Sequence, residues 1–132
     1  MTTNKEISTS KENSEQATHQ EAREQGFVLP LADVFETPEA YVVMLDMPGA
    51  QKENMRVRLE RGSLSVSAPA DRHFQESGTV LHEESRIPGY ARTFALGDGI
   101  DLKNVDAQFQ DGVLTVKLFK NEELKPREIS IK

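Results

Sequence analysis

Apolar and polar side chains alternate with a period of two in the middle of the chain, first over residues 55–59 and again over residues 64–68. The apolar positions are Met55, Val57 and Leu59 in the first run and Leu64, Val66 and Ala68 in the second. Successive side chains of a β-strand point to opposite faces, so each run predicts a strand with one face in a core and the other in water. Arg61-Gly62 lies between them and predicts the turn that makes them neighbours in a meander.

A second pair of alternating runs is joined by Asp111-Gly112, which is the strongest hairpin signal in the sequence. A two-residue type I′ turn needs positive φ angles, which Gly adopts freely and Asp tolerates better than most residues. Beyond the turn, one face of the arm is apolar and the other is mixed. The apolar face holds Leu114, Val116 and Leu118, and the mixed face holds Val113, Thr115, Lys117 and Phe119. Such an arm is typical of a two-layer β protein.

Three further stretches have high strand propensity and end at turn residues. They are residues 31–35, 40–47 and 80–96, the last with a break or bend at Pro88-Gly89. Pro48-Gly49 follows the second and suits the central positions of a type II turn. Many short strands with turns between them, and no convincing helix, predict an all-β protein. The fold we expect is an antiparallel immunoglobulin-like β-sandwich of about one hundred residues.

The two ends of the chain differ from this middle part. Residues 1–26 carry few apolar side chains, too few to offset the entropy cost of ordering, so we expect a disordered arm. The chain of 132 residues suits a single domain. We divide it into a polar arm (residues 1–28), a β-sandwich domain (29–120) and a carboxyl-terminal tail (121–132).

The tail ends in an apolar pair, Ile129 and Ile131, after a polar linker. Residues two apart project from the same side of an extended segment, and such a pair is expected to occupy a groove. From Lys120 an extended linker reaches roughly 30 Å to Ile129 at about 3.3 Å per residue. The tail could therefore close its own sandwich or cross to a neighbouring subunit, and these residues leave both alternatives open.

Charge and cysteine content narrow the partners. The chain has 16 basic and 22 acidic residues, a net charge of −6 and a pI near 5.1. Nucleic acids and anionic membranes require a basic footprint, so we expect neither as a partner. There is no cysteine, which fits the reducing cytoplasm. No apolar run has the length of a membrane span, so a cytoplasmic protein is the prediction.

No convergent set of catalytic side chains appears, so we expect no enzyme activity. Ser8 and Lys11 have a Ser-x-x-Lys spacing, but they lie in the polar arm without the other elements of such an active site. The three histidines, His19, His73 and His82, share no spacing typical of metal ligands. We therefore expect neither a metal nor a cofactor.

Four ordered motifs resemble those of the small heat shock proteins, which are built on the α-crystallin domain. The resemblance is to the bacterial and plant branch of that family. The resemblance runs from about Pro30 to Lys132, and its most specific element is the hairpin. The motifs are Ala107-x-Phe109-x-Asp111-Gly112-Val113-Leu114, Asp46-Met47-Pro48-Gly49, Ala32-Asp33-Val34-Phe35-Glu36-Thr37 and Ile129-x-Ile131.

This resemblance implies an ATP-independent holdase that binds partly unfolded client proteins and forms homodimers and larger homo-oligomers. It implies that the Ile129 and Ile131 tail docks in an edge groove of a neighbouring domain. The groove would be lined by Met55, Val57, Leu59, Ala107 and Phe109. It further implies that Arg92 lies near the dimer interface, and that Phe74 lies in a loop strand exchanged between dimer partners.

Two features depart from the resemblance. The first is that Gly97 and Phe119 stand where the family commonly has proline, so we expect those strand ends to be looser or differently paired. The arm of residues 1–26 has no aromatic residue, which argues against large cages and against strong client binding. A protein-binding sandwich of the co-chaperone type, with one defined partner and little holdase activity, is the alternative that this polar arm favours.

Overall fold

The computed structural model describes residues 25–70, 78–84 and 86–132, and within them the ordered elements are seven strands and two single turns of 3₁₀-helix. The strands are β1 (Leu31–Glu36), β2 (Ala40–Asp46), β3 (Arg56–Glu60), β4 (Ser63–Pro69), β5 (Gly89–Ala95), β6 (Ile100–Gln110) and β7 (Val113–Lys120). The 3₁₀ turns are η1 (Lys52–Asn54) and η3 (Glu122–Leu124). The arm expected to be disordered lies almost wholly outside the described residues.

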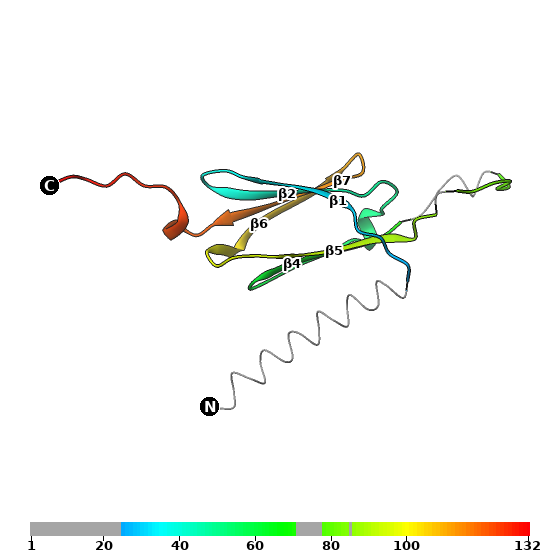
Figure 1. The fold of residues 1–132 in the computed structure, drawn as a ribbon, viewed down its shortest axis with the longest axis horizontal. Coiled ribbons are helices and arrows are strands. Elements are labelled where there is room, and N and C mark those ends of the chain that lie inside the picture. The colour runs from blue at the N-terminus through cyan, green and yellow to red at the C-terminus, as the bar shows by residue number, and fades with distance from the viewer. Residues whose placement is uncertain (1–24, 71–77, 85) are drawn as a thin grey trace, which may run out of the picture.

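The strands form two antiparallel sheets packed face to face (Figure 1). One sheet has the strand order β1-β2-β7-β6 and the other has the order β3-β4-β5. This confirms the predicted all-β sandwich. A short parallel bridge adds Val28 to the outer edge of β5, where its N–H donates to the Gly89 carbonyl at 2.9 Å and its carbonyl accepts from Ala91 N–H at 3.0 Å.

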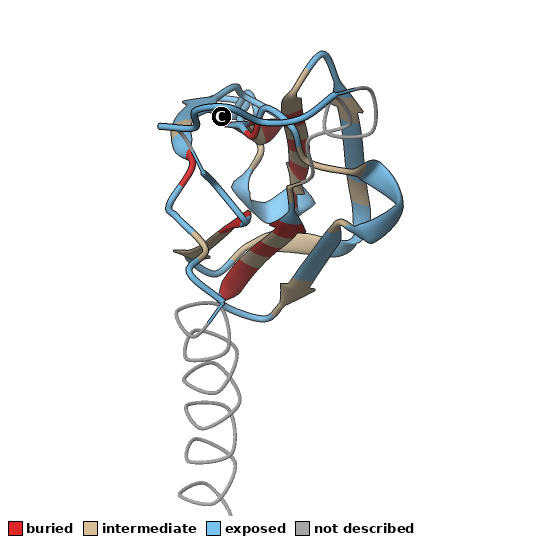
Figure 2. Cartoon of the chain, turned by 90° about the vertical axis from the view of Figure 1, so that its right-hand side faces the viewer, coloured by how far each residue is buried: buried red, intermediate tan, exposed pale blue. Residues whose placement is uncertain are grey.

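The core lies between the sheets and follows the alternation in the sequence. Along β7, Leu114, Val116 and Leu118 are 0–2 % exposed, whereas the residues between them face outward and are half-buried. In β4, Leu64, Val66 and Ala68 are buried in the same way. Figure 2 shows buried residues, in red, alternating with intermediate ones, in tan, along strands of the sandwich. The period-two pattern therefore predicted the core face of the central strands correctly.

The hairpin between β6 and β7 has the predicted tight turn. Gln110 pairs with Val113, and the two residues between them have φ angles of 53° at Asp111 and 78° at Gly112. These are the positive angles that a type I′ turn requires. The Gly112 carbonyl also accepts a hydrogen bond from Met47 N–H at 2.7 Å, which joins the turn to the end of β2.

The turn after β2 also matches its prediction. Ala50 N–H donates to the Met47 carbonyl at 3.1 Å, and Gly49 has a φ of 84°, as the third residue of a type II turn requires. Tyr90 of β5 donates its hydroxyl to the Pro48 carbonyl at 2.7 Å. This bond ties the end of one sheet to the other.

The break expected at Pro88-Gly89 agrees with the start of β5 at Gly89, but the extended strand expected before it, from residue 80, is wrong. The residues described between 78 and 88 form no strand, and Val80 and Leu81 are 52 % and 95 % exposed. A strand requires a neighbour for its backbone hydrogen bonds, and none of the described strands pairs with this segment. Residues 78–84 lie at the far end of the molecule from the carboxyl terminus (Figure 1).

The expected loosening of β7 at Phe119 is also wrong. β7 continues to Lys120, and Phe119 pairs with Ala40 of β2. The Lys117 ammonium lies 5.0 Å from the centroid of the Phe119 ring, a cation–π contact on the outer face of the sheet. Unlike proline, phenylalanine keeps its backbone N–H, so it can sit in a strand with two neighbours.

Candidate functional site

Two open sheet edges lie on the same side of the sandwich. β3 is an edge of the three-stranded sheet and β6 is an edge of the four-stranded sheet. On the opposite side the chain passes directly from Val28, paired with β5, into β1, so those two edges are neighbours. β3 and β6 must therefore face each other across the other side. We call the strip between them the β3–β6 groove.

The five residues predicted to line this groove lie on these two strands or directly beside them. Met55 precedes β3, Val57 and Leu59 lie in it, and Ala107 and Phe109 lie in β6. Their partners in register are core positions: Val57 pairs with Val66, and Ala107 with Val116. They point to the core side, yet Val57 is still 37 % exposed and Ala107 is also exposed. The groove thus presents apolar side chains beside strand edges that pair with no other described strand.

A hollow at one end of the groove marks where the two edges approach. Its walls include Glu60 at the end of β3, and Ile100 and Leu102 at the start of β6. The rest of the wall is formed by the turn after β3, the loop between β5 and β6, and Asn121 at the start of the tail. The five residues predicted to line the groove lie outside this hollow. Between Ile100 and Val105 the pairing of β6 with β7 is irregular, which turns the first residues of β6 away from a regular ladder.

The tail leaves the domain beside this hollow, and its two isoleucines are exposed to solvent. Ile129 is 81 % exposed and Ile131 is 98 % exposed. Figure 1 shows the tail running away from both sheets, in the direction opposite to residues 78–84. The sequence left open whether the tail closes its own sandwich or crosses to a neighbouring subunit. In this structure the isoleucine pair of the tail does not pack on its own sandwich.

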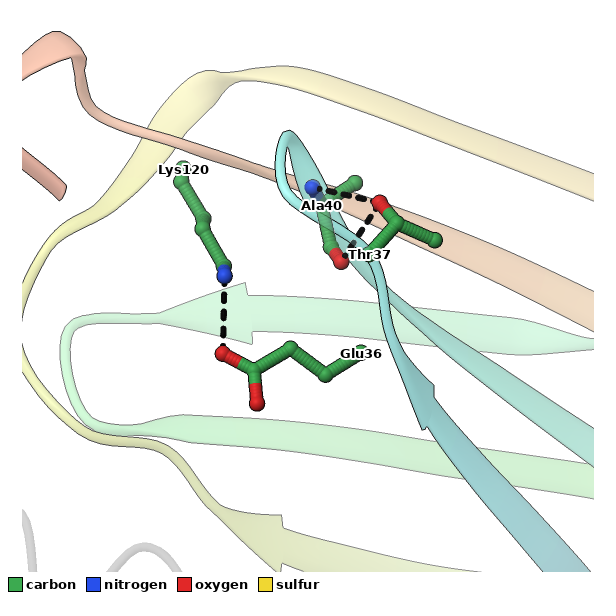
Figure 3. A network of polar contacts seen from close by, with 4 residues as sticks. All are labelled: Glu36, Thr37, Ala40 and Lys120. Carbon is green, nitrogen blue, oxygen red and sulfur yellow. Dashed lines mark hydrogen bonds and ion pairs between the residues drawn. The ribbon is translucent and has the colours of Figure 1, made fainter. Parts of the chain in front are cut away.

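An ion pair between a buried lysine and a largely exposed carboxylate fixes the point where the tail starts. Lys120, only 8 % exposed, donates from Nζ to Glu36 Oε1 at 2.7 Å and lies 4.9 Å from the centroid of the Tyr41 ring (Figure 3). The hydrogen bond and the positive charge of Lys120 lower the pKa of the Glu36 carboxyl. The turn between β1 and β2 is held by Thr37, whose hydroxyl accepts a hydrogen bond from Ala40 N–H at 3.0 Å (Figure 3). These contacts join β1, β2 and β7 at the start of the tail.

The other outer strand, β1, is an apolar edge that the sequence did not single out. Leu31, Val34 and Phe35 are 77 %, 57 % and 51 % exposed, and β1 has a described neighbour only on the β2 side. Residues 31–35 were predicted as a strand from their high strand propensity, but propensity alone does not distinguish an edge strand from a central one.

The placement of Arg92 and Phe74 near a dimer interface stays a prediction. Arg92 of β5 is half-buried and donates from Nη1 to the Pro30 carbonyl at 3.0 Å, and its guanidinium carbon lies 4.9 Å from the centroid of the Phe94 ring. It therefore anchors the segment that leads into β1. Phe74 lies outside the described residues.

Other candidate chemistry does not converge. Among residues 25–70, 78–84 and 86–132 no group of three or more potential ligands could hold a metal ion. His82 and Glu84 approach to 3.8 Å, but both side chains are largely in solvent. His19, His73, Ser8 and Lys11 lie outside the described part of the chain. Its helices are single turns, and none is long enough to cross a membrane.

The sequence and the structure both match known proteins. The chain is 35 % identical over 104 residues to spore protein SP21 of Stigmatella aurantiaca, covering 78 % of this chain and 62 % of that protein. It is 38 % identical over 94 residues to the 18.3 kDa class I heat shock protein of Oxybasis rubra, covering 70 % of this chain and 58 % of that protein. The chain thus spans about three fifths of the length of these relatives.

Solved structures give the same result for the fold. Heat shock protein 16.0 from Schizosaccharomyces pombe superposes with a TM-score of 0.65 at 28 % identity, covering 80 % of this chain and 99 % of that chain. A small heat-shock protein from Xylella fastidiosa superposes with a TM-score of 0.62 at 28 % identity, covering 79 % and 96 %. The model of the Hsp20/alpha crystallin family matches residues 33–132. The chain therefore belongs to the Hsp20/alpha crystallin family of small heat shock proteins, a family of chaperones rather than enzymes.

Proposed function

We propose that this chain is an ATP-independent holdase that binds partly unfolded proteins and keeps them from aggregating. The observation that carries the proposal is the combination of open apolar edges with a bare isoleucine pair on a projecting tail. Family membership supports it. Binding of this kind involves no chemical step and needs no cofactor, and the cysteine-free sequence fits a cytoplasmic location.

The surfaces suit a client that is itself unfolded. An unfolded segment exposes apolar side chains and unpaired backbone groups, and both can be satisfied at the edge of a sheet. β1 offers such an edge, with Leu31 and Phe35 on one face and Val34 on the other. The β3–β6 groove offers a second. Because these contacts depend on apolar area and backbone hydrogen bonds, they would accept many client sequences.

In our proposal the tail of one subunit docks Ile129 and Ile131 in the β3–β6 groove of another subunit. Fully burying an isoleucine contributes about 1.5–3 kcal/mol before the cost of ordering the tail, so one contact is weak. Several such contacts in an oligomer act together and give an assembly that still exchanges subunits. The solved Xylella fastidiosa protein is described as having a distinct high order structure, which supports assembly in a relative.

Homodimerisation is the first step of this assembly in our proposal, with Arg92 and Phe74 near the interface. Arg92 already holds the Pro30 carbonyl in its own chain, so it fixes the path of residues 28–30 between β5 and β1. Replacing Arg92 with alanine should therefore weaken the dimer. An equal dimer dissociation constant in the variant and the parent, measured by analytical ultracentrifugation, would reject this role.

The holdase is tested by heating an aggregation-prone protein without ATP and following turbidity. Suppression at a few subunits per client is expected, and no suppression even at excess favours the module with a single defined partner.

The tail is tested in parallel by changing Ile129 and Ile131 to alanine, which should shrink the oligomer toward the dimer in light scattering. Ser130→Ala, which keeps both isoleucines, is the control. An unchanged mass in the double variant rejects docking by the tail.

A further inference from the structure

The first residues of the tail are fastened to the domain at Gly99. Asn121 N–H donates to the Gly99 carbonyl at 2.7 Å. The chain then makes the single turn η3, in which Leu124 N–H donates to the Asn121 carbonyl at 2.9 Å. This turn brings the Leu124 side chain onto Gly99. The backbone bond and the apolar contact thus meet at one residue of the β5–β6 loop.

Gly99 fits this contact in two ways. Its φ angle is 97°, a conformation that side chains disfavour. A Cβ placed on it would overlap the Leu124 side chain and lie 2.6 Å from Cγ, closer than real Cβ atoms come. The leucine therefore occupies space that only a glycine leaves open.

Polar contacts close the same turn. Lys125 N–H donates to the Glu122 carbonyl at 3.3 Å, and Lys125 Nζ donates to Glu122 Oε1 at 2.8 Å. Just before the turn, Lys120 N–H donates to the Glu39 carbonyl at 2.9 Å. We call residues 121–125, held in this way on Gly99, the tail clasp.

Beyond the tail clasp the apolar side chains of the tail are exposed to solvent. Leu124 is 45 % exposed, whereas Ile129 is 81 % and Ile131 is 98 % exposed. The free part from Lys125 to Ile129 spans roughly 13 Å at about 3.3 Å per residue, compared with roughly 30 Å if the tail were free from Lys120. The clasp therefore removes more than half of the reach of the isoleucine pair.

This reach matters because the tail starts beside its own groove. Asn121 and Gly99 line the same hollow as Glu60 at the end of β3 and Leu102 at the start of β6. A flexible tail attached there would meet its own groove at an effective concentration on the order of millimolar, far above that of a neighbouring subunit in dilute solution. Without a constraint, the tail's own domain would be its main competitor for docking.

We propose that the tail clasp directs the tail away from its own groove and so reserves the isoleucine pair for a different subunit. The inference rests on the proposed docking of the tail for its effect on assembly, but the clasp itself is a property of the single chain. Leu124 and Gly99 act as positioning residues. Loss of the clasp converts contacts between subunits into contacts within one subunit.

The cysteine-free sequence allows a direct measurement. Spin labels are placed on two introduced cysteines, Arg127→Cys in the tail and Gln108→Cys in β6. Labelled chains are mixed with an excess of unlabelled parent. The measured electron–electron distances then come from labels within one chain. The measurement is made with Ile129 and Ile131 changed to alanine, so that docking cannot contribute. We expect one narrow distance distribution with the clasp intact and a broad one in Leu124→Ser.

Two further variants control this result. Gly99→Ala should broaden the distances in the same way, because its Cβ expels the leucine from the other side of the contact. Glu123→Ser, which changes an exposed neighbour in the same turn, should leave them narrow. Equal distributions in the parent and in Leu124→Ser overturn the clasp, whether or not the tail docks.

The effect on assembly is read with both isoleucines present. Leu124→Ser should add a population at shorter distance, from tails in their own grooves, and should shift the mass in light scattering toward the dimer. A broadened distance with an unchanged oligomer mass overturns the role of the clasp in assembly. Failure of docking itself gives a different result: exchanging the isoleucines for alanine in the clasped chain then leaves the mass unchanged.

Discussion

The central strand β7 and the edge strand β3 carry equally regular alternation but end in different environments. In β7 Leu114, Val116 and Leu118 are 0–2 % exposed, whereas Val57 in β3 remains 37 % exposed on the corresponding face. β7 has a neighbour on each side, and β3 has one. Alternation therefore tells which face of a strand points to the core, and the number of neighbours decides how far that face is covered. In this protein the incompletely covered face is where we place the docking groove.

The largest loss of stability is expected in the central strand β7. Leu118 is fully buried in β7, and Leu118→Ala removes its packing and leaves a cavity. We expect the free energy of unfolding to fall by about 2–5 kcal/mol, measured by chemical denaturation. A loss below about 1 kcal/mol would show that the centre of the sandwich is no better packed than its edges.

The second-largest loss of stability is expected at the turn that joins the groove strand β6 to the central strand β7. Gly112 has a φ of 78°, so Gly112→Ala places a side chain in a left-handed conformation and should cost about 1–2 kcal/mol. Gly97→Ala is the control, because Gly97 has no positive φ and a Cβ there would meet no atom within 4 Å. Equal stability losses in the two variants would contradict the assignment of strain to the hairpin turn.

A smaller stability effect is expected at the edge itself. Val57→Ala removes side-chain area that is already partly in water, so the free energy of unfolding should fall by about 1 kcal/mol or less. The same variant should weaken tail docking, which lowers the oligomer mass in light scattering. A stability loss as large as that of Leu118→Ala would remove the distinction between edge and centre.

The smallest effect is a pH dependence at the start of the tail. Lys120 lowers the pKa of Glu36 below its ordinary value of 4.5, so the ion pair stabilises the fold above that value and this contribution is lost as the pH falls through the lowered pKa. Glu36→Gln should lack that part of the pH dependence when thermal unfolding is followed from pH 7 to pH 3. Identical pH profiles for the parent and Glu36→Gln would show that the pair contributes nothing, the usual result for exposed carboxylates.

Much of the fold could be predicted because the signals are local. The angles at Asp111 and Gly112 follow from the turn chemistry of two adjacent residues, and the buried face of β7 follows from its alternation. The extension predicted from residue 80 failed for the opposite reason. Its apolar residues suggested a strand, but a strand also needs a partner, and no described strand of the chain pairs with it.

The candidate site could be predicted only in part. The sequence alone singled out Ile129 and Ile131, and the family resemblance supplied the residues of the groove. The Lys120–Glu36 ion pair joins residues 84 positions apart, and no local pattern indicates it. The contact of Leu124 with Gly99 likewise depends on where the β5–β6 loop lies in space.

The sequence by itself therefore determined most of the strands, the tight turns, the inward faces of β3, β4 and β7 and the apolar pair of the tail, because period and turn chemistry act over a few residues. Only the tertiary structure decided which strands became edges and how the tail leaves the domain. Both depend on the stacking of two sheets, which places β3 beside β6 and Leu124 on Gly99. Contacts between distant segments are set by the whole fold, and no short stretch of sequence encodes them.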